Sequence, residues 1–172
     1  MSAERAPAMP PYGAVRLDGD VDARGANTVG LLHAEGAESP VLDDVRSWLR
    51  ESAGVELQIV EDASGLTPMF SPVGSPVVRV PLAGVGEGVS QVLPVLATIA
   101  RARRGRLGLS PLVLIEQPEL HLHPAAELQL AALLARRTDD DARFVLETHS
   151  ENLLLGVQLA VLGSAVLLLR RP

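Results

Sequence analysis

Two short apolar runs in this sequence each end on side chains that could handle phosphate groups. Residues 112–115 (LVLI) end on Glu116, and residues 143–148 (RFVLET) are followed directly by His149. In an open α/β sheet, ligands bind at the edge formed by the carboxyl ends of the strands. We therefore expect an acid and a histidine to lie at one edge, as a site for phosphate chemistry.

The first run has the pattern of a Walker B strand. A short apolar run bounded by turn signals predicts a strand buried on both faces, as in a parallel sheet. The acid at its end, Glu116, is placed to hold the magnesium ion of a nucleotide, directly or through water. We favour this function over a surface-loop role, because a buried strand ending in clustered acids is uncommon without a ligand.

The residues after Glu116 decide whether a water molecule could be activated there. A general base must accept a proton, and the amide of Gln117 cannot do so. Glu119 could substitute only if the loop turns its carboxylate toward the phosphate. Both roles of Glu119, a base and a polar loop residue, stay open on sequence grounds.

Glycines precede a predicted helix in residues 83–96 (AGVGEGVSQVLPVL). They would let the backbone approach a phosphate, and the helix N-terminus would add free N–H groups. A lone G-x-G is weak evidence, and a flexible loop is the alternative. Ser90 could cap the helix, donate to a phosphate, or do both.

The histidines also have structural interpretations. The H-x-H spacing of His121 and His123 suits zinc, but only His33 and His149 remain as further histidines. We therefore favour a helix cap or an interface role for His123. Residues 148–151 fit the [ST]-x-x-[DE] capping box, so this segment could simply start a helix. A capped start would also fix the imidazole of His149, which could stabilise charge developing on a γ-phosphate.

The composition restricts the function further. All 15 basic residues are arginine, so the lysine of a G-x-x-x-x-G-K-[ST] phosphate loop is absent from this polypeptide. The net charge of −6 argues against a broad nucleic-acid surface, so we expect nucleic acid only indirectly, through partners. The absence of cysteine excludes disulfides and fits a cytoplasmic location. We find no signal peptide and no membrane-spanning run.

The 172 residues, 47% of them hydrophobic, are enough for one domain. Residues 1–38 are expected to form a loosely ordered lead-in, and residues 39–172 the folded lobe. Ser39 is a predicted N-cap, and Pro94 is tolerable only near the start of its helix. Helices are expected from Pro40 to about Gly54, from near Ser90 to about Arg106, from Pro124 to about Arg137 and from Asn152 to Leu162. Strands are expected at 55–60, 77–82, 112–115, 143–148 and 165–169, with a connector over 61–76.

Three segments together, GVGEGVSQVLPVL, VLIEQPELHLHP and LETHSENLLL, closely resemble the SMC-like and OLD-like branch of the ABC-like ATPases, often called AAA family ATPases. The resemblance covers roughly Gly25 to Gln158. It implies an α/β fold of the P-loop NTPase class, with a mostly parallel sheet flanked by helices. It also implies that the chain is an incomplete, C-terminal lobe, because Walker A and the Q-loop belong to the family's N-terminal lobe.

The resemblance also implies roles for individual residues. The glycine segment resembles the ABC signature, which contacts ATP held by the partner subunit, although Gly86 replaces the expected serine. Its nucleotide-binding candidates are Gly86, Gly88, Ser90 and Gln91. Glu116 would hold Mg²⁺, Gln117 takes the usual position of the catalytic glutamate, and His149 resembles the switch histidine. A D-loop at a dimer interface would comprise Leu120, His121, Leu122 and His123.

We therefore expect a lobe of an ATP- and Mg²⁺-dependent ATPase that acts as a homodimer or with a Walker-A-bearing partner chain. The catalytic candidates are Glu116, Gln117, Glu119 and His149. The isolated chain is expected to be inactive. The alternative is a non-catalytic interaction module that keeps the fold and the dimer surface.

Overall fold

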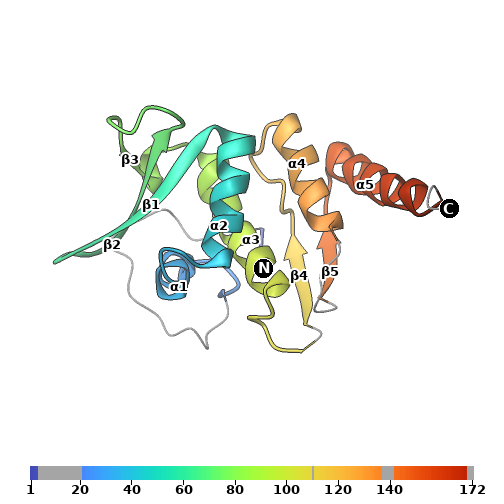
Figure 1. The fold of residues 1–172 in the computed structure, drawn as a ribbon, viewed down its shortest axis with the longest axis horizontal. Helices are drawn as coiled ribbons and strands as arrows, with labels where there is room; N and C mark the ends of the chain where they lie inside the picture. Colours follow the sequence, from blue (N-terminus) through green and yellow to red (C-terminus); the bar gives the residue numbers. More distant parts are fainter. Residues whose placement is uncertain (4–20, 110, 137–141, 170–172) are drawn as a thin grey trace.

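The computed structural model describes residues 1–3, 21–109, 111–136 and 142–169, with the side chains of the last helix described as far as Leu162. Two helices and then three strands come first along the chain, and helices and strands alternate from Glu87 onward (Figure 1). The helices are α1 (Thr28–Glu35), α2 (Pro40–Trp48), α3 (Glu87–Arg103), α4 (Pro124–Ala135) and α5 (Glu151–Leu169). The strands are β1 (Val55–Asp62), β2 (Gly65–Pro72), β3 (Val80–Pro81), β4 (Leu112–Glu116) and β5 (Arg143–Glu147).

Helix α3 forms the centre of the core. Every residue from Val92 to Ala102 is buried, so no face of this part of the helix reaches solvent. A helix that is apolar on all sides requires protein around it. The core around α3 contains residues of α2, of the strand pair β1–β2, of β4 and of α4. The position of α3 therefore determines where its two ends lie.

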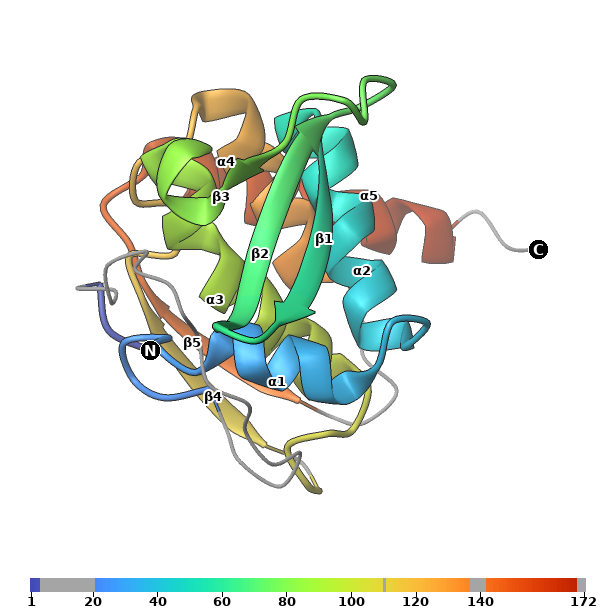
Figure 2. The ribbon, with the colours of Figure 1, turned by 90° about the vertical axis from the view of Figure 1, so that its left-hand side faces the viewer.

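Two small sheets contribute to this core. Strands β1, β2 and β3 form an antiparallel sheet, which lies in front of α2 and α3 in Figure 2. Strands β4 and β5 form a separate parallel pair. The α/β class is thus confirmed, and among the described strands parallel pairing is confined to β4 and β5. The inward residues Val113 and Ile115 of β4 are buried, whereas Leu114 on the other face is 58% exposed. The prediction that this strand is buried on both faces is therefore wrong, because only one face of β4 packs against the core.

Several predicted elements are confirmed with their local causes. The hydroxyl of Ser39 accepts the N–H of Leu42 at 3.1 Å and caps α2, with Pro40 at its first position. A π-helical turn, Leu49–Ala53, continues α2, and Gly54 ends it in the left-handed conformation with φ 66°. Glycine suits that conformation because it has no Cβ to clash. Strand β1 follows at once.

The connector predicted over residues 61–76 is wrong for Gly65–Pro72, which form β2. A tight turn after Asp62 makes a hairpin, with Asp62 opposite Gly65. Leu66, Pro68 and Phe70 alternate inward and are buried. Proline normally argues against a strand, but Pro68 lies outside the part of β2 that pairs with β3. The strand predicted at 77–82 shrinks to Val80–Pro81.

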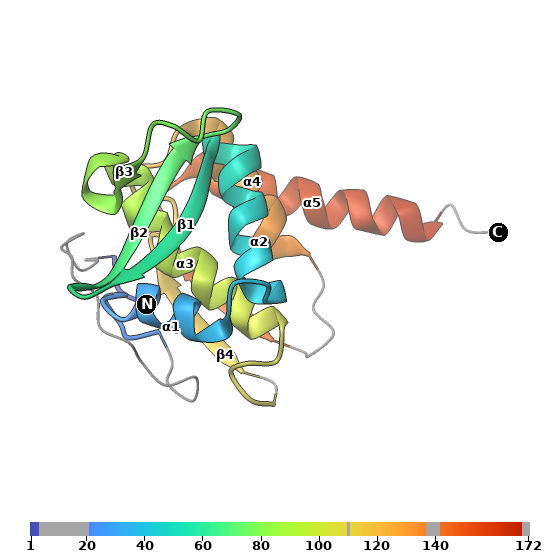
Figure 3. The same ribbon diagram turned by 60° about the vertical axis from the view of Figure 1, so that its left-hand side comes forward.

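Two helix boundaries also differ from the prediction. Helix α3 begins at Glu87, before the predicted start near Ser90, so Pro94 lies inside the helix. Because proline has no backbone N–H, one hydrogen bond of the helix is missing at this position. Residues 165–169 were predicted as a strand but continue α5, because the single Gly163 does not stop a long apolar helix. Helix α5 projects away from the body of the fold in Figures 1 and 3. Leu155, Leu159 and Leu162 on it are more than half exposed.

Helix α1 lies within the segment that was expected to be a loosely ordered lead-in. Its residues Val29, Leu31 and Leu32 are buried, so part of residues 1–38 packs with the core. Residues 4–20 of that segment lie outside the described residues. Within the described part of the chain, none of the helices combines the length and apolar character that a membrane crossing requires.

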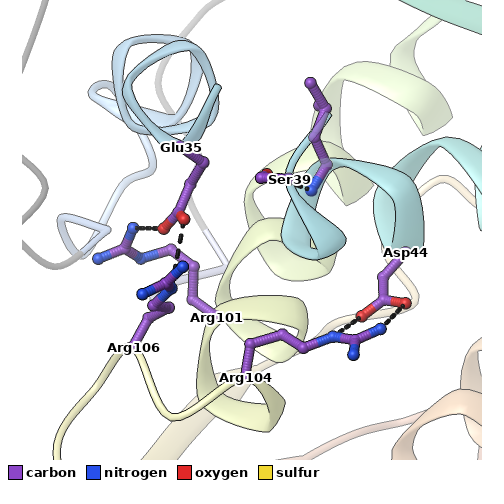
Figure 4. A network of polar contacts seen from close by, with 7 residues as sticks. Glu35, Ser39, Asp44, Arg101, Arg104 and Arg106 are labelled. Carbon is purple, nitrogen blue, oxygen red and sulfur yellow. Dashed lines mark hydrogen bonds and ion pairs between the residues drawn. The ribbon is translucent and has the colours of Figure 1, made fainter. Parts of the chain in front are cut away.

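A buried ion pair joins α1 to α3. The Arg101 guanidinium donates to the carboxylate of Glu35, and both side chains are only 1% exposed. Arg106 adds a second contact to Glu35 at 3.4 Å. Figure 4 shows this cluster beside a more exposed pair, in which Arg104 donates to both oxygens of Asp44 at 2.7 and 2.8 Å. The two pairs differ mainly in burial.

Replacing Glu35 by alanine is expected to lower the free energy of unfolding by about 3–5 kcal/mol, because Arg101 would be left as an uncompensated buried charge. The matched control is Asp44→Ala, which removes the exposed pair and should cost about 0–1 kcal/mol. Urea denaturation of both variants measures the difference. Equal losses in the two variants would contradict the structural role of the buried pair.

Candidate functional site

The parallel pairing of β4 and β5 brings the two predicted strand tips together. Glu116 is the register partner of Glu147, each the last residue of its strand. Paired residues of neighbouring strands point to the same face of a sheet, so these two carboxylates are neighbours. Gln117 and Thr148 follow them directly. The sequence prediction that Glu116 and the segment before His149 share one edge is therefore correct at the level of the backbone.

The loop after β4 is fastened to the end of β5 by its backbone. The N–H of Gln117 donates to the carbonyl of Glu147 at 2.7 Å. Gln117 and His121 both have positive φ, 42° and 63°, a region that non-glycine residues rarely adopt. Such backbone strain persists only where surrounding contacts enforce it, and it concentrates at functional sites.

Glu119 links the same two segments through its side chain. Its Oε1 accepts the hydroxyl of Thr148 at 2.7 Å and the backbone N–H of His149 at 3.2 Å. Its Oε2 is buried and has no hydrogen-bond partner among the described residues. The carboxylate thus holds the turn that carries His149. This arrangement gives Glu119 a positioning role that the sequence did not reveal.

The turn before α5 is fixed by a second carboxylate. The hydroxyl of Ser150 donates to Glu127 on α4 and accepts the N–H of Leu153 at 3.0 Å. Ser150 is therefore the cap of α5. The capping box predicted with Thr148 as the cap is wrong, because the Thr148 hydroxyl donates to Glu119 and accepts the Ser150 N–H at 3.0 Å instead. The imidazole of His149 is at the surface.

The N-terminus of α3 lies against the loop after β4. A Cβ on Gly88 would come within 2.6 Å of the His121 carbonyl oxygen, so only glycine allows this approach. The Glu87 carboxylate lies 3.6 Å from Nε2 of His121. The glycine segment and the loop 117–123 are therefore neighbours in space.

Two sequence predictions about helix caps can be compared with the geometry. Gly86, with φ 107°, precedes α3, and no side chain caps the helix. The prediction that Ser90 caps it is wrong, since its hydroxyl donates to the Glu87 carbonyl at 2.9 Å. His123 does cap α4, because its Nδ1 accepts the N–H of Ala125 at 3.3 Å. Gln91 has a buried Oε1 without a partner among the described residues.

The rest of the loop turns tightly. The N–H of Leu120 donates to the Gln117 carbonyl at 3.2 Å, and that of Leu122 to the Glu119 carbonyl at 2.9 Å. Leu122 packs against the core, whereas His121 stays partly exposed. These turns give the loop a single defined course from β4 to α4.

The pair Glu116 and Glu147 offers oxygen ligands of the kind that Mg²⁺ prefers. Both line a pocket of about 350 Å³, together with Met1, Leu114 and Val145. One oxygen of Glu116 accepts the backbone N–H of Ala3 at 3.0 Å. Mg²⁺ is commonly bound by one or two carboxylates together with water and substrate phosphates, and this donor set fits that pattern. Within the residues described, no cluster of three or more His, Cys, Asp or Glu side chains is present.

Sequence reasoning missed Glu147 and Thr148 as members of the site. Both precede His149 directly, but only the register of β4 with β5 pairs Glu147 with Glu116. The contact from Thr148 to Glu119 spans 29 residues. No periodicity in the sequence encodes it.

Comparison with known proteins adds a family assignment. The model of the family described as "AAA domain, putative AbiEii toxin, Type IV TA system" matches residues 36–155. That range includes α3, the β4–α4 loop and the turn before α5. None of the curated proteins matches the sequence.

Solved structures share the fold at low sequence identity. One, described as "Structural biochemistry of ATP-driven dimerization and DNA stimulated activation of SMC ATPases", aligns with a TM-score of 0.52 at 14% identity, over 68% of this chain and 71% of that one. The Smc head domain of Pyrococcus furiosus bound to the C-terminal domain of ScpA has the same score and identity, over 68% and 30%. An SmcHead bound to the C-winged helix domain of ScpA gives 0.56 at 13%, over 81% and 42%. The shared feature is the fold of SMC ATPase heads.

A double-mutant cycle tests the link from Glu119 to the turn that carries His149. Glu119→Ala and Thr148→Ala are expected to be coupled by about 1–2 kcal/mol in the free energy of unfolding, as for a hydrogen bond to a charged group. The control cycle pairs Glu119→Ala with Thr67→Ala on β2, which should be additive. Additive losses in the first cycle would show that the two loops are not fastened by this contact.

Proposed function

We propose that this chain, which belongs to the family described as "AAA domain, putative AbiEii toxin, Type IV TA system", is the C-terminal lobe of an ABC-like ATPase. Its activity would be the binding and hydrolysis of ATP with Mg²⁺. The observation that carries this proposal is the pairing of Glu116 with Glu147 at the tips of two parallel strands. The loops that follow these strands are fastened to each other beside the N-terminus of α3.

The proposed roles follow from the positions of the side chains. Glu116, with Glu147 beside it, would hold Mg²⁺, and the ion would neutralise charge on the phosphates. His149 would donate a hydrogen bond to charge developing on the γ-phosphate. The Glu119 carboxylate would hold the backbone of His149 in place, as its contact to that N–H supports.

The lobe would need a lysine-bearing phosphate loop from another lobe or chain. The sequence contains no lysine to reach the β- and γ-phosphates. In addition, Leu112, Leu114 and Val145 on one face of the β4–β5 pair are more than half exposed. Parallel sheets are normally covered on both faces, so this exposed face supports the proposal that another lobe or chain packs against β4 and β5.

The N-terminus of α3 would meet nucleotide in a dimer or with a Walker-A-bearing partner. Gly86, Gly88, Ser90 and Gln91 lie in or before its first turns, where N–H groups are free of side-chain caps. The adjacent loop Leu120–His123 would form the D-loop contact with the partner. This part of the proposal rests on the resemblance to ABC-like ATPases and on the neighbouring positions of the two segments.

A second candidate function is a non-catalytic interaction module with the same fold. Gln117 favours it, because an amide at the position of the catalytic glutamate cannot accept a proton. The engagement of Glu119 with Thr148 and His149 favours it too, since that carboxylate already has a structural partner. A neighbouring gene that encodes G-x-x-x-x-G-K-[ST] would favour the ATPase.

The isolated chain is expected to bind Mg-ATP weakly, because the lysine and its phosphate-cradling loop are absent from it. Calorimetric titration of the purified chain with Mg-ATP measures this directly. Low-micromolar affinity of the chain alone would contradict the proposed need for a second lobe.

Gln117→Glu tests the proposed chemistry in an assembly with a Walker-A-bearing partner. If activation of water limits the rate, the new carboxylate should raise ATP turnover by about 100- to 10,000-fold without tightening ATP binding. The matched control is Gln158→Glu on α5, which adds the same charge away from the site and should leave turnover unchanged. Unchanged turnover in both variants would favour the interaction module.

A further inference from the structure

A second pocket lies at the opposite end of α3 from the candidate nucleotide site. It has a volume of about 300 Å³ and opens between α2 and the C-terminal ends of α3 and α4. Trp48, Arg103, Arg104 and Arg136 are among the residues that line it. Helix α3 has 17 residues, so its two ends are about 25 Å apart at 1.5 Å per residue.

Three guanidinium groups and two carboxylates, those of Asp44 and Glu51, line this pocket, so its charged lining has an excess of arginine in a protein whose net charge is −6. Arg104 is paired with Asp44 (Figure 4). Arg103 donates to the carbonyls of Leu133 and Arg136 at the end of α4, the latter at 3.0 Å, which fixes its position. Within the described part of the chain, neither Arg103 nor Arg136 forms an ion pair with a carboxylate.

The positive charges in this pocket are close enough to affect one another. Burial is the main cause that lowers the pKa of Arg103 to about 10, and the positive charge of Arg136 contributes, while the carboxylate of Asp44 acts in the opposite direction. Arg103 therefore stays protonated at neutral pH but is less well solvated than an ordinary surface arginine. A bound anion would relieve both the repulsion and the loss of solvation.

The unsatisfied polar atoms around the pocket are all of one kind. Nε1 of Trp48 and Nε of Arg103 are buried without a hydrogen-bond partner among the described residues, and both are N–H donors. Buried donors without an acceptor are rare in folded proteins. Both atoms belong to side chains that line the pocket, and an acceptor bound there would reach them only after those side chains shift.

We propose that this pocket binds a phosphate-class oxyanion, with Arg103 and Arg136 as its main ligands. Arginine matches the geometry of phosphate oxygens and remains charged when it is partly buried. The volume exceeds that of one phosphate ion, so the group could be free phosphate or the phosphate of a small organic molecule. The site is separate from the strand tips, and it stands whether or not the chain hydrolyses ATP.

Trp48 is the single tryptophan of the chain and lines the pocket, so its fluorescence reports on the site. The full chain is titrated with inorganic phosphate at constant ionic strength set by chloride, and calorimetry repeats the titration. A saturable change in fluorescence and matching heat are expected. Parallel titrations with adenosine monophosphate and adenosine distinguish free phosphate from a phosphate monoester.

Arg136→Gln is expected to weaken phosphate binding at least about 10-fold, as for the loss of one charged hydrogen-bond donor. Arg136 is exposed and follows the end of α4, so the variant should keep its unfolding transition. The matched control, Arg79→Gln, removes the same charge from an exposed loop and should leave binding unchanged.

Three outcomes would overturn the proposal. The first is the absence of saturable binding by both fluorescence and calorimetry up to tens of millimolar phosphate. The second is equal weakening by Arg136→Gln and Arg79→Gln, which would indicate a general charge effect. The third is that chloride changes the fluorescence as much as phosphate does, which would indicate general screening of charges and no specific binding site.

Discussion

The burial of α3 on all sides is the constraint on which the rest of the structure depends. Its buried residues, Val92–Ala102, require the antiparallel sheet, α2, β4 and α4 around them. One charged residue in that stretch, Arg101, is compatible with burial because Glu35 on α1 compensates it. The two ends of α3 consequently have fixed neighbours. Its N-terminus meets the loop after β4 through Gly88, and its C-terminal end directs Arg103 toward the end of α4. The next residue, Arg104, pairs with Asp44 on α2.

The candidate nucleotide site is organised by hydrogen bonds between loops, and its side chains come from segments that are distant in the sequence. The backbone of Gln117 is bonded to Glu147, and the Glu119 carboxylate to Thr148 and His149. A preorganised edge of this kind suits charge stabilisation, because its donors need no rearrangement when charge develops. It suits proton abstraction less well, since Gln117 has no basic group and Glu119 is occupied. The geometry is therefore compatible with both proposed functions, the ATPase lobe and the interaction module.

Local patterns in the sequence predicted the elements that local physics determines. The cap at Ser39, the end at Gly54 and the position of the strand that ends on Glu116 all depend on residues close in the chain. The errors fall where long-range pairing decides the outcome. Strand β2 contains two prolines and exists because β1 pairs with it, and α1 is ordered by contacts that include the Glu35–Arg101 pair. The link from Glu119 to Thr148 and the pairing of Glu116 with Glu147 likewise depend on the register of β4 and β5.

The proposed function requires three segments to contact nucleotide in the assembled ATPase: the start of α3, the loop after β4 and the turn before α5. Hydrogen–deuterium exchange in an assembly with a Walker-A-bearing partner tests it directly, with and without Mg²⁺ and a nonhydrolysable ATP analogue. Nucleotide is expected to slow exchange together in residues 86–91, 116–123 and 147–151. Nucleotide binding that leaves exchange in these three segments unchanged would contradict it.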